Sequence, residues 1–245
     1  MKEANGKGNN LNKKISLLIL LVILISVVIV NKSLIGNVLD KKLRKTRTLE
    51  SAILEIRPVV EPKMRKLFAG KKCKYPPEEV RLLALKQEKI LELWAENSEK
   101  WSLIKKYPVL AASGKAGPKL KEGDCQVPEG VYKLVLLNPN SNFHLSVKVE
   151  YPNVYDLEKA GKDKRTKLGG DIFIHGSNVS IGCLAMGDEA IEEIFYLIKL
   201  TGLKNSGIII APCDMRSKKV IIDKTAPSWV NELYQNIRKE LDQFK

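Results

Sequence analysis

The sequence predicts a mainly β domain of the α+β class, with one internal helix and a helical tail. Apolar and polar residues alternate strictly over 143–150, as on a half-buried strand. Short runs of Ile and Phe bounded by glycine, at 171–175 and 207–211, predict two further strands. The chain has 245 residues, of which 44% are hydrophobic, and this is enough for one domain with a core and some additional chain.

The amino-terminal region begins with a basic tail, residues 1–14, and an apolar run over 15–30 that is interrupted only by Ser16 and Ser26. We predict a transmembrane anchor over 15–32, with the tail in the cytoplasm, because the run shows no polar face and its length comes close to that of a bilayer core. The residues after the run lack the small-residue pattern of a signal-peptidase site, so we favour a retained anchor over a cleaved signal.

The positive charge of the chain is concentrated around this run. The formal net charge is +14, and residues 1–75 contribute +12 of it. A nucleic-acid-binding domain carries its basic excess on the folded part, so we expect no nucleic-acid partner. Residues 33–77 are predicted to be a basic juxtamembrane stalk with a short helix that starts at Pro58, and two prolines at 76–77 end it.

The folded domain is predicted to cover residues 78–220. Its first part, residues 80–112, fits either a strand or a helix by the period of its apolar residues, although 97–100 resemble a hairpin turn. Gly187 precedes an amphipathic helix that begins at Asp188. Residues 221–245 are predicted to be a helical extension, because Trp229, Leu233, Ile237 and Leu241 recur every fourth residue.

A histidine and a cysteine eight residues apart are the main candidates for chemistry. His175 ends the predicted strand at 171–175, and Cys183 precedes the predicted helix. A thiol nucleophile needs a base or a local field that favours the thiolate, and both a histidine and a helix amino terminus supply one. Two glycines, Gly176 and Gly182, permit the chain reversals that this pairing requires. A buried, inert cysteine is the alternative that this spacing leaves open.

The segment around these residues resembles the catalytic loop of the L,D-transpeptidase family (the YkuD-type domain), in its short-loop, YafK-like branch. His175-Gly176 resembles the first element of the family motif, and Ser180-Ile181-Gly182-Cys183 resembles the second, S-H-G-C, element. Further similar stretches lie at 112–119, 122–132, 138–146 and 151–153. The resemblance implies a β-sandwich catalytic domain with a helix after the catalytic cysteine.

Two departures from the family pattern are visible. The spacer from His175 to Cys183 is eight positions, shorter than the loop in most of the family. Ile181 also replaces the histidine of the second element, and Ala185 stands where an arginine is usual. Both are typical of the short-loop branch. They leave two reactions open, which are transpeptidation and hydrolysis by an endopeptidase or amidase. A non-catalytic wall-binding protein that kept the fold is a third hypothesis.

The resemblance also implies roles for individual residues. Cys183 attacks a carbonyl at the diaminopimelate of a peptidoglycan stem peptide, His175 takes the thiol proton, and the Gly176 carbonyl orients the imidazole. Backbone N–H groups around Ile181, Gly182 and Cys183 form the oxyanion hole, and Ser180 supports the loop. The expected partners are stem peptides and the cytoplasmic membrane, and the expected location of the domain is outside the cytoplasm, in the periplasm or cell envelope. No metal or cofactor is needed.

The remaining candidates rest on weaker signals. His144, Ser177 and Arg216 are possible contacts for a charged stem peptide, although a solvated or structural role is the default for each. Cys73 and Cys125 would be able to pair in an oxidising compartment, but a sequence alone does not establish such a pair.

Overall fold

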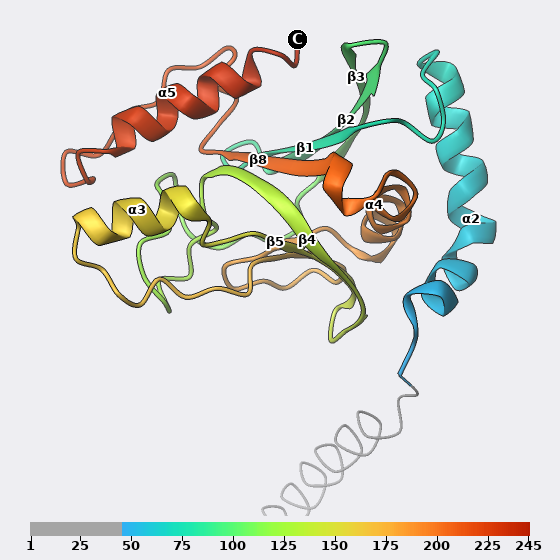
Figure 1. Ribbon diagram of the computed structural model, residues 1–245, viewed down its shortest axis with the longest axis horizontal. Coiled ribbons are helices and arrows are strands. Elements are labelled where there is room, and N and C mark those ends of the chain that lie inside the picture. The colour runs from blue at the N-terminus through green and yellow to red at the C-terminus, as the bar shows by residue number, and fades with distance from the viewer. Residues whose placement is uncertain (1–45) are drawn as a thin grey trace, which may run out of the picture. The chain divides into compact units, whose positions relative to one another are not determined.

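The computed structural model of the protein describes residues 46–245, and eight strands of that region form one sheet in the order β3-β2-β1-β8-β4-β5-β6-β7 (Figure 1). The strands are β1 (Val80–Leu85), β2 (Ile90–Asn97), β3 (Lys100–Pro108), β4 (Gly130–Ser141), β5 (His144–Val149), β6 (Phe173–His175), β7 (Leu184–Ala185) and β8 (Ser206–Ala211). The helices are α2 (Leu49–Gly70), α3 (Val154–Lys162), α4 (Asp188–Thr201), α5 (Val230–Leu241) and the short η1 (Leu203–Asn205). The α+β class expected from the sequence is confirmed.

Strand β4 joins the two halves of the sheet. Its first residues, from Gly130 to Lys133, pair with β8, and its later residues pair with β5. The register shifts between Leu134 and Leu136, which bends the strand there. The sheet is therefore a single curled sheet, and the expected β-sandwich is corrected to this form, because one long strand belongs to both halves.

The hairpin at 97–100 is present as predicted. Strand β2 ends at Asn97 and β3 begins at Lys100. The two turn residues between them, Ser98 and Glu99, have positive φ angles of 53° and 63°. Two successive left-handed residues are characteristic of the two-residue turn that matches the twist of a hairpin. The ambiguous region around this turn is thus a pair of strands.

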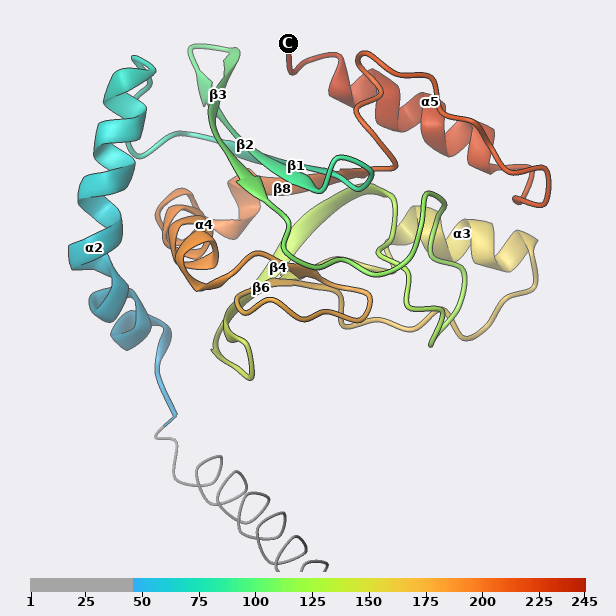
Figure 2. The same cartoon turned by 180° about the vertical axis from the view of Figure 1, so that it is seen from behind.

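The helix of the predicted stalk begins earlier than expected and belongs to the folded unit. It starts at Leu49, where the Thr48 side chain accepts a hydrogen bond from the Ser51 N–H at 3.1 Å, and it contains both Pro58 and Pro62. Its buried residues recur every fourth position: Ala52, Ile56, Val60, Met64 and Phe68. This stripe packs in the main core with α4, which lies beside α2 in both views (Figures 1 and 2). The described part of the predicted stalk is therefore corrected to a domain helix.

The two faces of the sheet contact different helices. On one face, Ile208 and Ile210 of β8 join the main core with α4 and α2. On the other face, Ile209 packs with Leu233 and Ile237 of α5, the helix predicted within 221–245 (Figure 2). The predicted anchor over 15–32 and tail over 1–14 lie outside the described residues. Among the residues that are described, no helix is long and apolar enough to span a bilayer.

Candidate active site

Two short parallel strands, β6 and β7, bring the predicted pair of residues together. Ile174 is opposite Leu184, and His175 is opposite Ala185. Cys183 immediately precedes β7, and its Sγ atom lies 3.4 Å from the Phe173 N–H at the start of β6. Phe173 is two residues before His175 on the same strand. The two strands therefore bring Cys183 and His175 into the same part of the sheet.

A hydrogen bond to a backbone carbonyl fixes the orientation of the His175 ring. The Nδ1 atom lies 2.7 Å from the carbonyl oxygen of Gly176. A carbonyl oxygen only accepts hydrogen bonds, so Nδ1 carries the proton, and in the neutral ring Nε2 is a base. The Phe143 ring stacks on the imidazole at a centroid distance of 4.7 Å, and the His175 residue is only 3% exposed. Burial lowers the pKa of His175 from its ordinary value.

Position 176 has no room for a side chain, so it requires a glycine. A Cβ atom at this position would lie 2.5 Å from Asp188 Oδ1 and 2.7 Å from the carbonyl oxygen of Phe143. Neither distance is compatible with a side chain, and the second neighbour is backbone. The glycine therefore lets the chain pass close to α4 and β5 while its own carbonyl faces His175.

The thiol of Cys183 is half-buried. Its Sγ atom accepts a hydrogen bond from the Phe173 N–H at 3.4 Å and lies 3.6 Å from the carbonyl oxygen of Asp171. Burial raises the pKa of the Cys183 thiol, and the Phe173 N–H opposes this effect only in part. Burial thus favours the neutral form of both the Cys183 thiol and the His175 imidazole.

Two serine hydroxyls hold the turn in front of Cys183. The Ser180 hydroxyl accepts from the Cys183 N–H at 3.0 Å and donates to the Cys183 carbonyl at 2.8 Å. The Gly182 N–H donates to the Ser113 hydroxyl at 2.6 Å, and Gly182 has a φ of +86°. The Ile181 side chain points outward, with 80% of the residue exposed. The expected oxyanion donors of residues 182 and 183 are thus bonded to hydroxyls at rest.

Sequence reasoning missed Ser113. Besides contacting Gly182, its hydroxyl donates to the Cys125 carbonyl at 2.6 Å, and so it joins the 112–126 segment to the catalytic loop. The only available signal was its place in the glycine-rich stretch that resembles the family. A hydroxyl that bridges segments 69 residues apart leaves no periodic pattern in the sequence.

The weaker candidates have other partners. His144 Nε2 lies 2.8 Å from Glu192 Oε1, and the Ser177 N–H donates to Asp188 Oδ1 at 2.7 Å, so both residues lie where β5 and the catalytic loop meet α4. Arg216 is bonded to Asp214, to Glu92 and to the carbonyl oxygen of Phe244. These contacts hold Arg216 in ion pairs with Glu92 and Asp214, next to the residues packed under α5, and its contact with a stem peptide stays a prediction.

The four cysteines, Cys73, Cys125, Cys183 and Cys213, are all free thiols. Cys73 is buried and Cys125 is exposed, so the possible bridge between these two is not formed. Within residues 46–245, no three His, Cys, Asp or Glu side chains are grouped in a way that would hold a metal ion.

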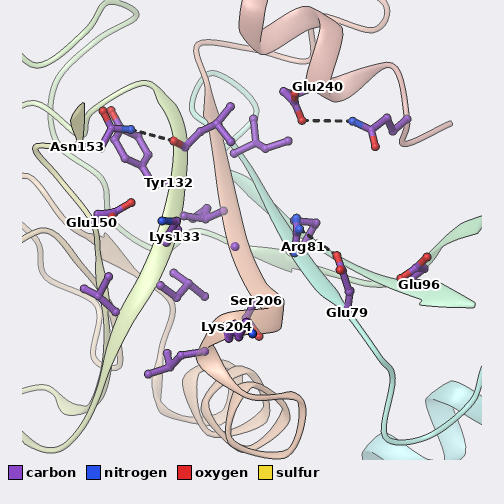
Figure 3. Close-up of a pocket in the computed structure, with 18 of the residues that line it drawn as sticks. Glu79, Arg81, Glu96, Tyr132, Lys133, Glu150, Asn153, Lys204, Ser206 and Glu240 are labelled. Atoms are coloured by element: carbon purple, nitrogen blue, oxygen red, sulfur yellow. Dashed lines mark hydrogen bonds and ion pairs between the residues drawn. The ribbon is translucent and has the colours of Figure 1, made fainter. Parts of the chain in front are cut away.

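One cavity of the structure adjoins the catalytic loop, and a larger one lies away from it. One of about 470 Å³ includes Ser113 in its wall and so adjoins the loop. Another of about 1040 Å³ lies where Arg81 of β1 and Lys133 of β4 flank the strand β8 (Figure 3). None of the predicted site residues lines the larger cavity.

Comparison with known proteins identifies the class of this site. The sequence profile of the L,D-transpeptidase catalytic domain (YkuD) matches residues 80–222. The chain therefore belongs to this family, and the resemblance deduced from the His175 and Cys183 motifs is confirmed. The match begins at β1 and ends beyond β8, so it includes every strand of the sheet.

Individual relatives cover less of the chain. The protein named "Putative L,D-transpeptidase YafK" from Escherichia coli K12 is 34% identical over 121 residues, which are 49% of this chain and 47% of that protein. The chain thus matches about half the length of this curated relative. Among solved structures, the helical cell shape determining protein Pgp2 from Campylobacter jejuni is 23% identical with a TM-score of 0.47, over 62% of this chain and 52% of that one. Bd1075 from Bdellovibrio bacteriovorus is 22% identical with a TM-score of 0.41, over 70% and 57%.

Proposed function

We propose that this protein is a cysteine acyltransferase of the L,D-transpeptidase type, acting on peptidoglycan stem peptides at diaminopimelate. The observation that most supports the proposal is the 2.7 Å hydrogen bond from His175 Nδ1 to the Gly176 carbonyl. It leaves Nε2 as the basic nitrogen of the ring, in the part of the sheet where Cys183 precedes β7. Binding alone would not require an oriented base beside a thiol, which disfavours the wall-binding alternative.

In the proposed first step, Cys183 Sγ attacks the carbonyl carbon of the diaminopimelate residue. The thiol proton moves to His175 Nε2, and the carbonyl oxygen becomes an oxyanion. When the tetrahedral intermediate collapses, the bond to the leaving amine breaks and His175 returns its proton to that amine. The product is a thioester between the stem peptide and Cys183.

The oxyanion is stabilised by backbone N–H groups of the turn 181–183. Two of these groups are bonded at rest to the hydroxyls of Ser113 and Ser180. The substrate oxygen therefore takes the place of a hydroxyl as it enters. This exchange retains a hydrogen bond for each buried N–H in both states, which avoids the cost of an unpaired donor.

The second step determines the reaction. An amine acceptor attacks the thioester to give a cross-link or an attached protein, and water attacks it to give a shortened stem or a released peptide. The same Cys183 thioester serves both outcomes, so the hydrolase is the second candidate function. Retention of residues 15–32 as a membrane anchor, with the domain outside the cytoplasm, is also part of the proposal, and it rests on the apolar run in the sequence.

The test is incubation of the full-length protein with diaminopimelate-type peptidoglycan, with products read by mass spectrometry. The Cys183→Ala variant is expected to lose all product formation, because no other group replaces the thiol. The Cys125→Ala variant is the matched control, since Cys125 is an exposed thiol whose sulfur lies 3.6 Å from the Gly123 carbonyl oxygen.

Three results are distinguishable in this experiment. New cross-links between diaminopimelate residues, absent from Cys183→Ala, identify a transpeptidase. Shortened stems or released peptides without cross-links identify a hydrolase. Identical products from the wild type and Cys183→Ala would refute the enzyme and leave the wall-binding protein.

A further inference from the structure

We infer that the 470 Å³ cavity beside the catalytic loop is a subsite for the free carboxylate groups of the stem peptide. Its binding groups are the ammonium groups of Lys89, Lys115 and Lys219. This inference deepens the proposed function, because it assigns the part of the substrate that lies away from the attacked carbonyl.

The cavity is formed where three segments meet. The turn between β1 and β2 contributes Lys89, the 112–116 segment contributes Lys115, and the chain after β8 contributes Lys219. Apolar groups complete the wall, and Ile221 among them is 94% exposed. A chain with both carboxylates and aliphatic carbons fits a cavity of this composition.

The charge in the cavity is one-sided. Four lysines line it and no aspartate or glutamate does. One of the four, Lys86, is buried and neutralised by Glu129, with Nζ 2.9 Å from Oε1. For Lys89, Lys115 and Lys219, no carboxylate of the described residues lies within the 4.0 Å of an ion pair. Three unpaired cations around one concave surface attract a ligand with several negative charges.

Ser113 connects this cavity to the nucleophile. It lines the cavity, and its hydroxyl accepts the Gly182 N–H at 2.6 Å, one residue before Cys183. A peptide whose carbonyl lies at Cys183 is therefore able to extend past Ser113 into the cavity. Diaminopimelate-containing stems bear free carboxylates on residues next to the attacked bond, and these are the groups that the lysines meet.

The test measures binding without turnover, in the full-length Cys183→Ala protein. The probe is a synthetic stem peptide containing D-glutamate and diaminopimelate, used with free carboxylates and with the same carboxylates amidated. The pocket variant is Lys89→Gln/Lys115→Gln/Lys219→Gln. The matched control is Lys66→Gln/Lys100→Gln/Lys239→Gln, which removes the same charge from lysines that line neither cavity described above.

The pocket variant is expected to bind the free-acid peptide about tenfold more weakly, since three partly exposed ion pairs of modest strength are lost together. Its affinity for the amidated peptide should match that of its parent, and the control should bind both peptides as the parent does. Thermal unfolding verifies that the variants are folded. If the triple variant is not, Lys115→Gln/Lys219→Gln replaces it, with an expected loss of about fivefold.

Equal loss of affinity in the pocket variant and the control would overturn the subsite, because it would show a general effect of net charge. Inorganic phosphate is the competitor. If it displaces the free-acid peptide at a concentration equal to that of the peptide itself, the subsite is also overturned, since the cavity would then accept any anion. Both results are independent of catalysis. If Cys183→Ala binds the peptide through these lysines but the wild-type protein forms no thioester at Cys183, only the proposed function is refuted.

Discussion

At the scale of the residue, the site depends on one tautomer of His175. The Gly176 carbonyl fixes the proton on Nδ1, and burial disfavours the charged forms of both His175 and Cys183. In the proposed mechanism the nucleophile is therefore generated during the reaction, by transfer of the thiol proton to Nε2, and is not a preformed thiolate. This distinction determines how the rate depends on pH.

We predict that kcat/KM falls at acid pH with a midpoint below 6.5, the ordinary pKa of histidine. The folded pKa of His175 is lowered, so the neutral base persists to a lower pH than in a free imidazole and is lost only as the pH falls through that value. The rate profile measures the midpoint, and an NMR titration of the two histidine rings assigns it, with His144→Gln to identify the signals. A midpoint above 6.5 would contradict the neutral pair.

We also predict that Gly176→Ala lowers kcat by at least tenfold. The added Cβ would meet Asp188 Oδ1 and the Phe143 carbonyl at under 3.0 Å, so the Gly176 carbonyl must move away from His175 Nδ1. The control is Gly161→Ala in α3, where nothing lies within 4 Å of the added atom. Activity in Gly176→Ala equal to that of the control would show that the carbonyl is not needed to orient the imidazole.

At the scale of the element, the capped helix α3 contains one carboxyl group, that of Asp156, whose burial disfavours its charged form. Asp156 lies in the first turn of α3, where its side chain accepts from the Asn153 N–H at 3.0 Å and from the Tyr132 hydroxyl at 3.4 Å. Burial is the main cause that raises the pKa of Asp156, to about 6. The protonated form is thus favoured in the folded state relative to the unfolded chain.

We predict that the free energy of unfolding of Asp156→Asn rises relative to wild type as the pH increases from 4 to 7.5. A raised folded pKa gives stability at low pH that is lost as the pH rises through about 6. A shift of two pKa units corresponds to a relative gain of roughly 3 kcal/mol. Urea denaturation at the two pH values measures it. Exposed Glu122→Gln is the control, and an equal pH response in both variants would contradict the prediction.

The same scale shows what the sequence was able to predict. Strands β5, β6 and β8 and helices α4 and α5 follow from local period and glycine boundaries, whereas His175 and Cys183 became candidates chiefly through the motif that resembles the family. The Ser113 contact and the ion pairs of Arg216 do not, because each joins residues that are far apart in the chain. The start of α2 was missed because Pro58 is a usual first residue of a helix, whereas here tertiary packing of the apolar stripe holds the helix together on both sides of it.

At the scale of the whole molecule, one bent strand and one packed helix define the domain. Strand β4 belongs to both halves of the curled sheet, so the half with the catalytic loop and the half beneath α5 share one backbone. Helix α2 precedes the family match at residue 80, yet its stripe is continuous with the main core of the catalytic domain. The folded unit accordingly begins at Arg47, before the boundary that the family defines.

We predict that Phe68→Ala lowers the free energy of unfolding of the catalytic domain by about 3–5 kcal/mol, as expected for a large aromatic removed from a core. Phe68 is 0% exposed and packs edge to face on Tyr75 at a centroid distance of 5.2 Å. Leu54 lies on the same helix and is 66% exposed, so Leu54→Ala should change the free energy of unfolding by no more than about 0.5 kcal/mol. Denaturant unfolding followed by tryptophan fluorescence reads the domain directly, because Trp94, Trp101 and Trp229 all lie outside α2. If α2 were an independent stalk, Phe68→Ala and Leu54→Ala would give the same unfolding midpoint for the domain. The domain boundary would then return to residue 78.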